Sequence, residues 1–143
     1  MAEYVYPEKQ TVQPGKNFIL IDSVRCTKGI LWHNNGSGIV TIRARSSNPC
    51  AQFSRFLVFV TSNIAVSEGQ TPGAISIGLA VNGEIDQTSV AIVTPTVAEA
   101  FFNASVATYL TVANGCCTSL AIENNSDIPI DGENTKIVIV PAN

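Results

Sequence analysis

The sequence predicts an all-β protein, and three observations carry that prediction. Short apolar segments of about five to eight residues recur along the chain, and Gly, Asn, Pro and Asp turn signals separate them about every 8–15 residues. No stretch shows the apolar periodicity of a convincing helix. With 143 residues, the chain is long enough for one domain with its own core, and a second domain is not expected.

The expected architecture is a single-domain jelly-roll β-sandwich of about eight to ten antiparallel strands. An immunoglobulin fold is the alternative. Its Cys…Trp…Cys framework does not fit, because Cys26 and Cys50 are too close in sequence and Trp32 is too near Cys26.

The first 16 residues differ from the rest of the chain. They contain Tyr4, Tyr6 and Pro7 but show no alternation of apolar and polar residues. We therefore expect an extended N-terminal arm over residues 1–16 and a jelly-roll domain over residues 17–143. An arm with two aromatic residues is often an attachment device, although a loose terminus fits the pattern equally well.

One hairpin is expected around residues 34–38, NNGSG, a strong turn between the apolar segment 30–33 and the alternating segment 39–44. Residues 53–61 form the most hydrophobic expected strand, which is apolar on both faces for almost its whole length. That pattern predicts a central strand that is covered on both sides.

A second hairpin is expected at Asn82-Gly83, a dipeptide that favours the two-residue turn with positive φ at both positions. It joins segment 75–81 to a partner that includes residues 89–94. The large residues of segment 75–81 are expected to face the core, and the small residues between them leave room for another surface to approach closely. The large set is Ile75, Ile77, Leu79 and Val81, and the small set is Ser76, Gly78 and Ala80.

A pair of adjacent cysteines follows the corner between two further strands, 106–112 and 118–124. Cys116 and Cys117 come directly after Gly115, with no histidine or acid nearby in sequence. We expect them to be small, apolar corner residues that pack between two core strands, close to a subunit contact or a symmetry axis.

The composition points to an assembling protein. Charged residues make up 13% of the chain, about half the ~25% typical of soluble domains, while apolar residues make up 45% and the mean hydropathy is +0.24. So much apolar surface is hard to hide in one small core, which favours burial against sister subunits. The net charge is −3 and the basic residues are scattered, which disfavours direct nucleic-acid binding.

Nothing in the sequence predicts a membrane or secretory segment. The first ten residues, MAEYVYPEKQ, contain neither a basic nor an apolar leader region, and the longest apolar run, residues 56–60, is far short of the ~20 residues that span a bilayer. We expect a soluble chain that is made in a cytoplasm and does not act at a membrane.

No motif for catalysis is present, and we expect neither an enzyme nor a cofactor. His33 is the only histidine, and no nucleophile elbow or comparable partner accompanies it. We interpret His33 as a hydrogen-bonded structural residue.

No metal site is expected either. The four cysteines form no C-x-x-C pair, and a Cys26–Cys50 disulfide is possible only if the protein matures outside the cell. Most acids fall in expected loops. Asp127, Asp131 and Glu133 could hold a calcium ion, but their spacing matches no EF-hand loop.

Several segments, taken in order, resemble small jelly-roll proteins encoded by tailed bacteriophages of gut Firmicutes, which are similar to trimers of the tumour-necrosis-factor and complement type. The resemblance covers roughly residues 17–140 and is weakest in the first 16 residues. The segments that carry it are Ile30-Leu31-Trp32-His33 with Gly36-Ser37-Gly38, Phe59 with Asn63-Ile64-Ala65-Val66, Ile75-Ser76-Ile77 with Asn82-Gly83-Glu84, Ile92-Val93-Thr94-Pro95, and Gly115-Cys116-Cys117 with Glu123-Asn124-Asn125-Ser126.

The resemblance implies a homotrimeric, non-enzymatic component of the virion surface that is made in the bacterial host cytoplasm. It would be a head decoration protein that contacts the major capsid protein or another virion protein, or the tip of a head or tail fibre. The candidate residues for contacts with sister subunits or the capsid are Tyr4, Tyr6, Tyr109, Cys116 and Cys117.

A carbohydrate-binding module is the alternative from a different class of function. Trp32, Tyr109 and the tyrosines of the arm have aromatic rings on which a surface glycan could stack. Single aromatic residues in strands are more often core or interface residues, so the glycan remains a possible rather than the expected partner.

Overall fold

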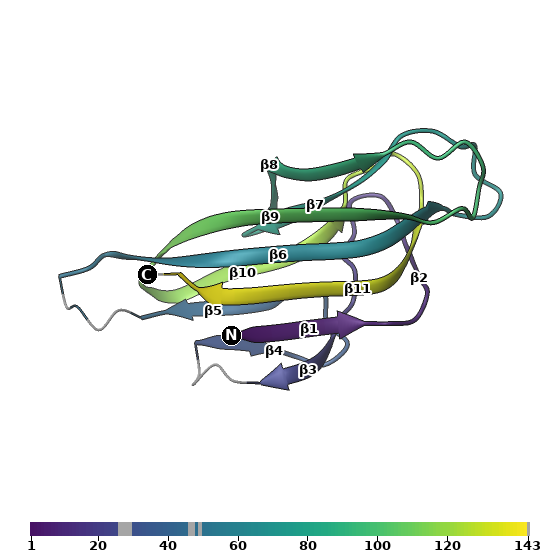
Figure 1. Ribbon diagram of the computed structural model, residues 1–143. Coiled ribbons are helices and arrows are strands. Elements are labelled where there is room, and N and C mark those ends of the chain that lie inside the picture. Colours follow the sequence, from purple (N-terminus) through teal and green to yellow (C-terminus); the bar gives the residue numbers. More distant parts are fainter. Residues whose placement is uncertain (26–29, 46–47, 49, 143) are drawn as a thin grey trace.

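The computed structural model of the chain is a two-layered β-sandwich, and it describes residues 1–25, 30–45, 48 and 50–142 (Figure 1). Within these residues there are eleven strands and no helix. The strands are β1 (Ala2–Tyr6), β2 (Gln10–Val12), β3 (Ile21–Arg25), β4 (Leu31–His33), β5 (Val40–Ala44), β6 (Phe53–Val66), β7 (Ile75–Val81), β8 (Glu84–Val93), β9 (Phe102–Ala113), β10 (Gly115–Asn124) and β11 (Ile130–Pro141).

The strands form two antiparallel sheets. Sheet A has the order β3-β1-β11-β6-β9, with β2 also paired to β11, and sheet B has the order β4-β5-β10-β7-β8. The chain passes from one sheet to the other between β3 and β4, β5 and β6, β6 and β7, β8 and β9, β9 and β10, and β10 and β11. This crossing pattern confirms the predicted all-β jelly-roll sandwich.

The core lies between the sheets and consists of the inward side chains of alternating strand positions. Ile137 and Ile139 of β11 belong to the same buried cluster as Ile77 and Leu79 of β7, and all four are at most 1% exposed. Phe18, from the link between β2 and β3, is fully buried in the same cluster. In the part of the chain described here, every buried side-chain nitrogen or oxygen has a hydrogen-bond partner.

Both predicted hairpins are confirmed. β4 pairs with β5 from Leu31 opposite Ile42 to His33 opposite Val40. β7 pairs with β8 through a turn in which Asn82 has φ 52° and Gly83 has φ 84°, so both central positions have the positive φ that the Asn-Gly pair was expected to supply.

The expected N-terminal arm is wrong for residues 1–12, which contain two strands of sheet A. β1 lies between β3 and β11, and Tyr6 is opposite Thr135. β2 pairs with the beginning of β11, where Val12 is opposite Ile130. The partner of both strands is the last strand of the chain, so no local pattern announces the pairing. Both ends of the chain consequently lie at the same end of the sandwich (Figure 1).

The prediction that residues 53–61 are covered on both sides does not hold within the single chain. β6 is central in sheet A, between β11 and β9, but its burial alternates along its length. Phe56, Val58 and Val60 face the core and are at most 3% exposed, whereas Phe53 and Phe59 point outwards and are 59% and 40% exposed. One face of this apolar strand is therefore bare in the single chain.

The small residues of β7 do receive a close neighbour, and it comes from the same chain. A methyl group on Gly78 would lie 3.0 Å from Cδ1 of Ile85 and 3.2 Å from Cγ2 of Val90. Both neighbours belong to β8, which starts at Glu84, earlier than the expected partner segment 89–94. Side chains of β8 thus occupy the space that the small residue Gly78 leaves on β7.

The corner between β9 and β10 joins the two sheets rather than two core strands. β9 is the edge strand of sheet A and β10 is central in sheet B. Asn114 fixes the corner because its backbone N–H donates to Gln52 O at 2.9 Å and its side-chain amide donates to Ala51 O at 2.9 Å.

The cysteine side chains at this corner are on the surface. Cys116 and Cys117 are both exposed in the single chain and are joined to each other in a disulfide, and their expected packing near a subunit contact or axis stays a prediction. Cys50 is an exposed free thiol. The possible Cys26–Cys50 disulfide involves Cys26, which lies outside the described residues.

Candidate assembly surface

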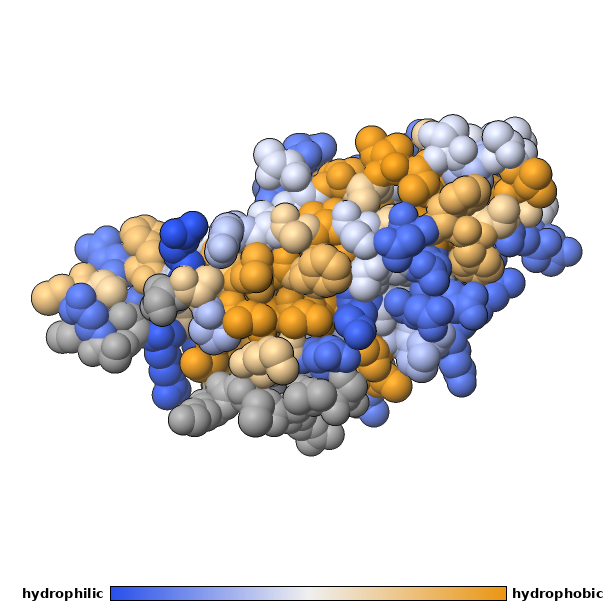
Figure 2. All heavy atoms as spheres, in the orientation of Figure 1, coloured by the Kyte–Doolittle hydropathy of each residue, from blue (hydrophilic) through white to orange (hydrophobic). Residues whose placement is uncertain are grey.

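On the outer face of sheet A, apolar side chains project from three neighbouring strands. Figure 2 shows an orange area over the middle of the sheet, with blue side chains beside it. We call this area the apolar face. Its members are Leu57 and Phe59 of β6, Ala107 and Tyr109 of β9, and Val138 and Val140 of β11.

The strand register brings these six residues into two rows across the sheet. Val140, Leu57 and Tyr109 form one row, since Leu57 is opposite Val140 on one side and Tyr109 on the other. Phe59 is likewise opposite Val138 and Ala107. Directly opposed side chains on one face lie close enough to make a continuous apolar surface.

Tyr109 is the most exposed large side chain of the apolar face, at 62%. The Arg55 guanidinium carbon lies 5.1 Å from the centre of the Tyr109 ring, within the range of a cation–π contact. Arg55 also comes from the outer face of β6. The aromatic ring therefore has a defined neighbour although it is on an edge strand.

A polar network adjoins the apolar face at one end. The Asn103 side-chain amide donates to Thr61 Oγ1 at 3.0 Å and to Asn63 Oδ1 at 3.1 Å, and Ser105 Oγ donates to Asn103 Oδ1 at 2.6 Å. These four residues lie opposite one another on β6 and β9. Since their polar groups bond to each other, another surface can cover them at a lower desolvation cost than unpaired groups would impose.

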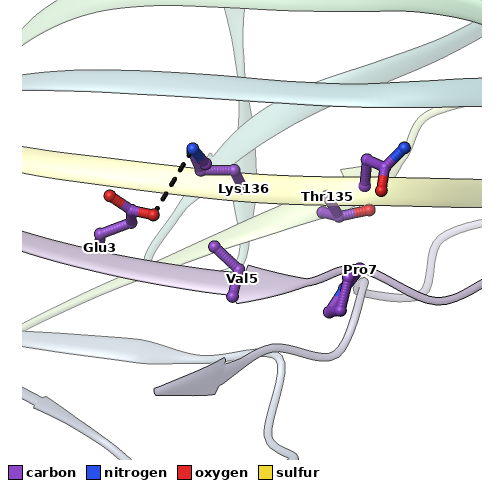
Figure 3. A pocket seen from close by; sticks show the side chains of 6 residues that line it. Glu3, Val5, Pro7, Thr135 and Lys136 are labelled. Carbon is purple, nitrogen blue, oxygen red and sulfur yellow. Dashed lines mark ion pairs between the residues drawn. The ribbon is translucent and has the colours of Figure 1, made fainter. Parts of the chain in front are cut away.

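A shallow hollow lies on the β1 side of the same sheet (Figure 3). Its volume is about 290 Å³. Lys136 Nζ and Glu3 Oε1 form an ion pair at 3.5 Å beside it, and Val5 of β1 contributes an apolar wall. The lining residues are Glu3, Val5, Pro7, Asn134, Thr135 and Lys136.

The structure separates the five predicted contact residues. Only Tyr109 lies on the apolar face. Tyr4 is 4% exposed and its ring centre is 4.8 Å from that of His33, so it belongs to the interior of the chain. Tyr6 is partly buried at the end of β1, and Cys116 and Cys117 lie at the beginning of β10 in sheet B. A role of these residues in contacts with other chains stays a prediction.

Five members of the apolar face were missed by sequence reasoning, although a signal for two of them was present. Residues 53–61 are apolar at successive positions, and the outward set includes Leu57 and Phe59. That pattern was interpreted as a central strand covered on both sides, and a face left bare in the single chain fits coverage by another copy.

His33 is a structural residue, as predicted. It is 8% exposed, and its Nε2 lies 2.8 Å from the backbone oxygen of Ser37 in the turn that follows. Together with the ring of Tyr4, this contact fixes the β4–β5 turn to β1.

Asp131, one of the three acids considered for calcium binding, is occupied by hydrogen bonds and an ion pair within the chain. Asp131 lies within β11 and is 2% exposed, and its Oδ1 accepts hydrogen bonds from Thr11 Oγ1 at 2.7 Å and Ser67 Oγ at 2.9 Å. Its Oδ2 lies 3.5 Å from Lys9 Nζ. Among the described residues, no three His, Cys, Asp or Glu side chains are placed to hold a metal ion.

Trp32 is the most exposed aromatic residue of sheet B, at 55%. It lies on β4, opposite Thr41 of β5, and therefore on the layer that carries none of the apolar face.

In the residues that the structure covers, no helix has the length and apolarity needed to cross a bilayer.

The fold and this surface together define a jelly-roll β-sandwich with one bare apolar sheet face. No family model matches the chain, and no curated protein sequence is detectably similar to it. Similarity appears at the level of solved structures, where the identity is low enough that it shows the fold alone.

Three such structures cover almost the whole chain. The Eiger TNF from S. frugiperda is similar with a TM-score of 0.68 and 12% identity, covering 99% of this chain and 92% of the other. Murine APRIL gives 0.62 and 10%, covering 98% and 99%. The globular domain of zebrafish complement 1qA gives 0.57 and 12%, covering 100% of both chains. The chain therefore has the jelly-roll fold found in these tumour-necrosis-factor and complement proteins.

Proposed function

We propose that the protein is a non-enzymatic, homotrimeric structural component of a tailed bacteriophage virion, which decorates the head surface and contacts the major capsid protein. The observation that carries the self-association is the apolar face of sheet A. Phe59 and Tyr109 are 40% and 62% exposed there, next to the half-buried Leu57, Val138 and Val140. A continuous apolar surface of this kind is typical of a protein interface.

The sequence composition supports the same proposal. Only 19 of the 143 residues carry charge, 8 basic and 11 acidic, so few charged groups oppose burial of a sheet face. The fold also matches that of tumour-necrosis-factor and complement proteins, which the sequence resemblance describes as trimers.

The virion role rests on the resemblance to phage-encoded jelly-roll proteins. It is tested by labelling purified phage particles with an antibody against this chain and recording electron micrographs. Label spread over the head supports a decoration protein, label confined to a fibre supports the alternative described next, and unlabelled particles contradict both.

A receptor-binding or carbohydrate-binding fibre tip is the second candidate, and the exposure of Trp32 favours it. Trp32 is bare on sheet B, opposite the layer proposed to assemble, so a trimer would still present this side chain. Exposed indole rings stack well on sugar rings. Binding to a glycan array that is lost in Trp32→Ala, with the assembly intact, would support this function; no binding by the wild type would remove it.

A further inference from the structure

The hollow on the β1 side of sheet A and Tyr109 on the β9 side are complementary in character. Tyr109 has an apolar ring and one hydroxyl group, and the hollow has the apolar walls of Val5 and Pro7 together with polar groups at its rim. The exposed side-chain amide of Asn134 is one of these polar groups. A buried tyrosine needs such a combination, since its hydroxyl must find a hydrogen-bond partner.

The hollow has a volume of about 290 Å³, which leaves room for an aromatic side chain. The hollow is also held in place from both sides, because Asn134 N donates to Pro7 O at 3.2 Å and Glu3 pairs with Lys136.

Tyr109 cannot fill the hollow of its own chain. β9 and β1 are separated by β6 and β11, which places them about 14 Å apart at ~4.8 Å per strand. Along the strands, the row of Tyr109 and Val140 lies four residues from that of Val5 and Lys136, or about 13 Å. A Tyr109 side chain could therefore reach the hollow only from another copy of the chain.

We propose that Tyr109 of one copy inserts into the hollow of the next copy. This inference rests on the proposed self-association and specifies which parts of sheet A meet. The contact joins two different patches, so in a threefold ring each chain uses its Tyr109 toward one neighbour and its hollow toward the other. Arg55, stacked on the Tyr109 ring, enters the interface with it and covers the ring on its other side.

The test uses a photo-crosslinking side chain in the full-length protein. Tyr109→p-benzoylphenylalanine keeps an aromatic group at the same place and bonds covalently to its neighbours on illumination. Equal amounts of ¹⁵N-labelled and unlabelled chains are mixed, illuminated, digested and analysed by mass spectrometry, so that crosslinks between copies are recognised by their mixed labels. Trp32→p-benzoylphenylalanine on sheet B is the matched control.

The expected result is a crosslink between copies that joins the peptide of Tyr109 to peptides containing Val5 or Asn134, with no crosslink from the control. A trimer whose crosslinks lead to other segments, above all to the Tyr109 peptide of a second copy, would overturn the inference and leave the proposed assembly standing. A chain that light scattering shows to be monomeric would overturn both.

Two further variants test the same contact without a crosslinker. Tyr109→Ala is expected to weaken assembly by about tenfold or more, because it removes the inserted ring. Tyr109→Phe keeps the ring and is expected to lose less. Since Tyr109 is exposed in the single chain, both variants should keep the thermal stability of the monomer. Equal affinity of Tyr109→Ala and the wild type would contradict the insertion.

Discussion

Phe18 lies directly against Gly132 of β11, and the lack of a side chain at position 132 is what makes room for it. A methyl group on Gly132 would overlap Cε1 of Phe18 and lie 3.0 Å from its Cδ1. Phe18 is fully buried and its backbone N–H donates to Ile122 O of sheet B at 2.8 Å. This one ring therefore sits between the two sheets and cannot move away without cost.

Gly132→Ala is expected to destabilise the chain by about 1–3 kcal/mol, the usual cost of overpacking a core. The melting temperature should fall by several degrees in a calorimetric scan. Gly73→Ala is the matched control, because a methyl group there meets nothing within 4 Å and its φ is not positive. It should be neutral or slightly stabilising. An unchanged melting temperature for Gly132→Ala would contradict the packing described for Phe18.

Asp131→Ala should loosen β2 from the sheet. The buried carboxylate accepts hydrogen bonds from Thr11 of β2 and from Ser67, and its removal leaves both hydroxyls without that partner. We expect a loss of about 1–3 kcal/mol in denaturant unfolding and faster hydrogen exchange at the amides of residues 10–12. Lys9→Ala is the control, since the half-exposed Lys9 should contribute less than about 1 kcal/mol. Equal effects of the two variants would argue against the role of the hydrogen bonds.

Asp86 should give a small pH dependence to the stability of the β7–β8 hairpin. The side-chain hydrogen bond from Thr88, followed by that from Ser89 and the Thr88 backbone N–H, lowers the pKa of Asp86 below its usual value. The charged form is therefore favoured by folding. Its contribution is present above the unfolded pKa of about 3.9 and is lost as the pH falls through the lower folded value.

Comparing the wild type with Asp86→Asn checks this effect. The difference in unfolding free energy between them should be constant from neutral pH down to about 5 and should shrink below about pH 4. A difference that grows toward acid pH would have the wrong sign for a lowered pKa.

Phe59→Asp should dissociate the assembly, because it places a charge in the middle of the apolar face, between Val138 and Ala107. The single chain should keep its fold, since Phe59 is 40% exposed and is not part of the core cluster. Circular dichroism checks the fold and sedimentation velocity checks the assembly. Trp32→Asp, an equally drastic change on sheet B, should leave the assembly mass unchanged. If Trp32→Asp dissociated the assembly and Phe59→Asp did not, the interface would lie on sheet B and this prediction would be contradicted.

Local sequence patterns predicted the features that depend on neighbouring residues. The turns at 34–38 and at Asn82-Gly83 and the alternation of β7 depend on residues no more than about twenty positions apart, and the contact of His33 with Ser37 is closer still. These hairpins need no knowledge of the rest of the chain, because turn chemistry and alternation already specify their register.

Features that depend on distant partners were not predictable in the same way. β1 was expected to belong to an arm because residues 1–16 show no alternation, and its partner strand, β11, lies at the other end of the sequence. The bare side of β6 was likewise hidden, because an apolar residue such as Phe59 fits burial by the same chain and burial by another copy equally well. Asp131 was expected to lie in a loop, and the hydrogen bonds that it accepts from Thr11 and Ser67 come from residues far away in the sequence.

The mass of the purified protein in solution tests the central claim most directly. Size-exclusion chromatography with multi-angle light scattering at micromolar concentration should give three times the chain mass of 15.1 kDa for the wild type. It should give one chain mass for Phe59→Asp. A wild-type protein that elutes with the mass of a single chain over the whole micromolar range would contradict the assembly through sheet A.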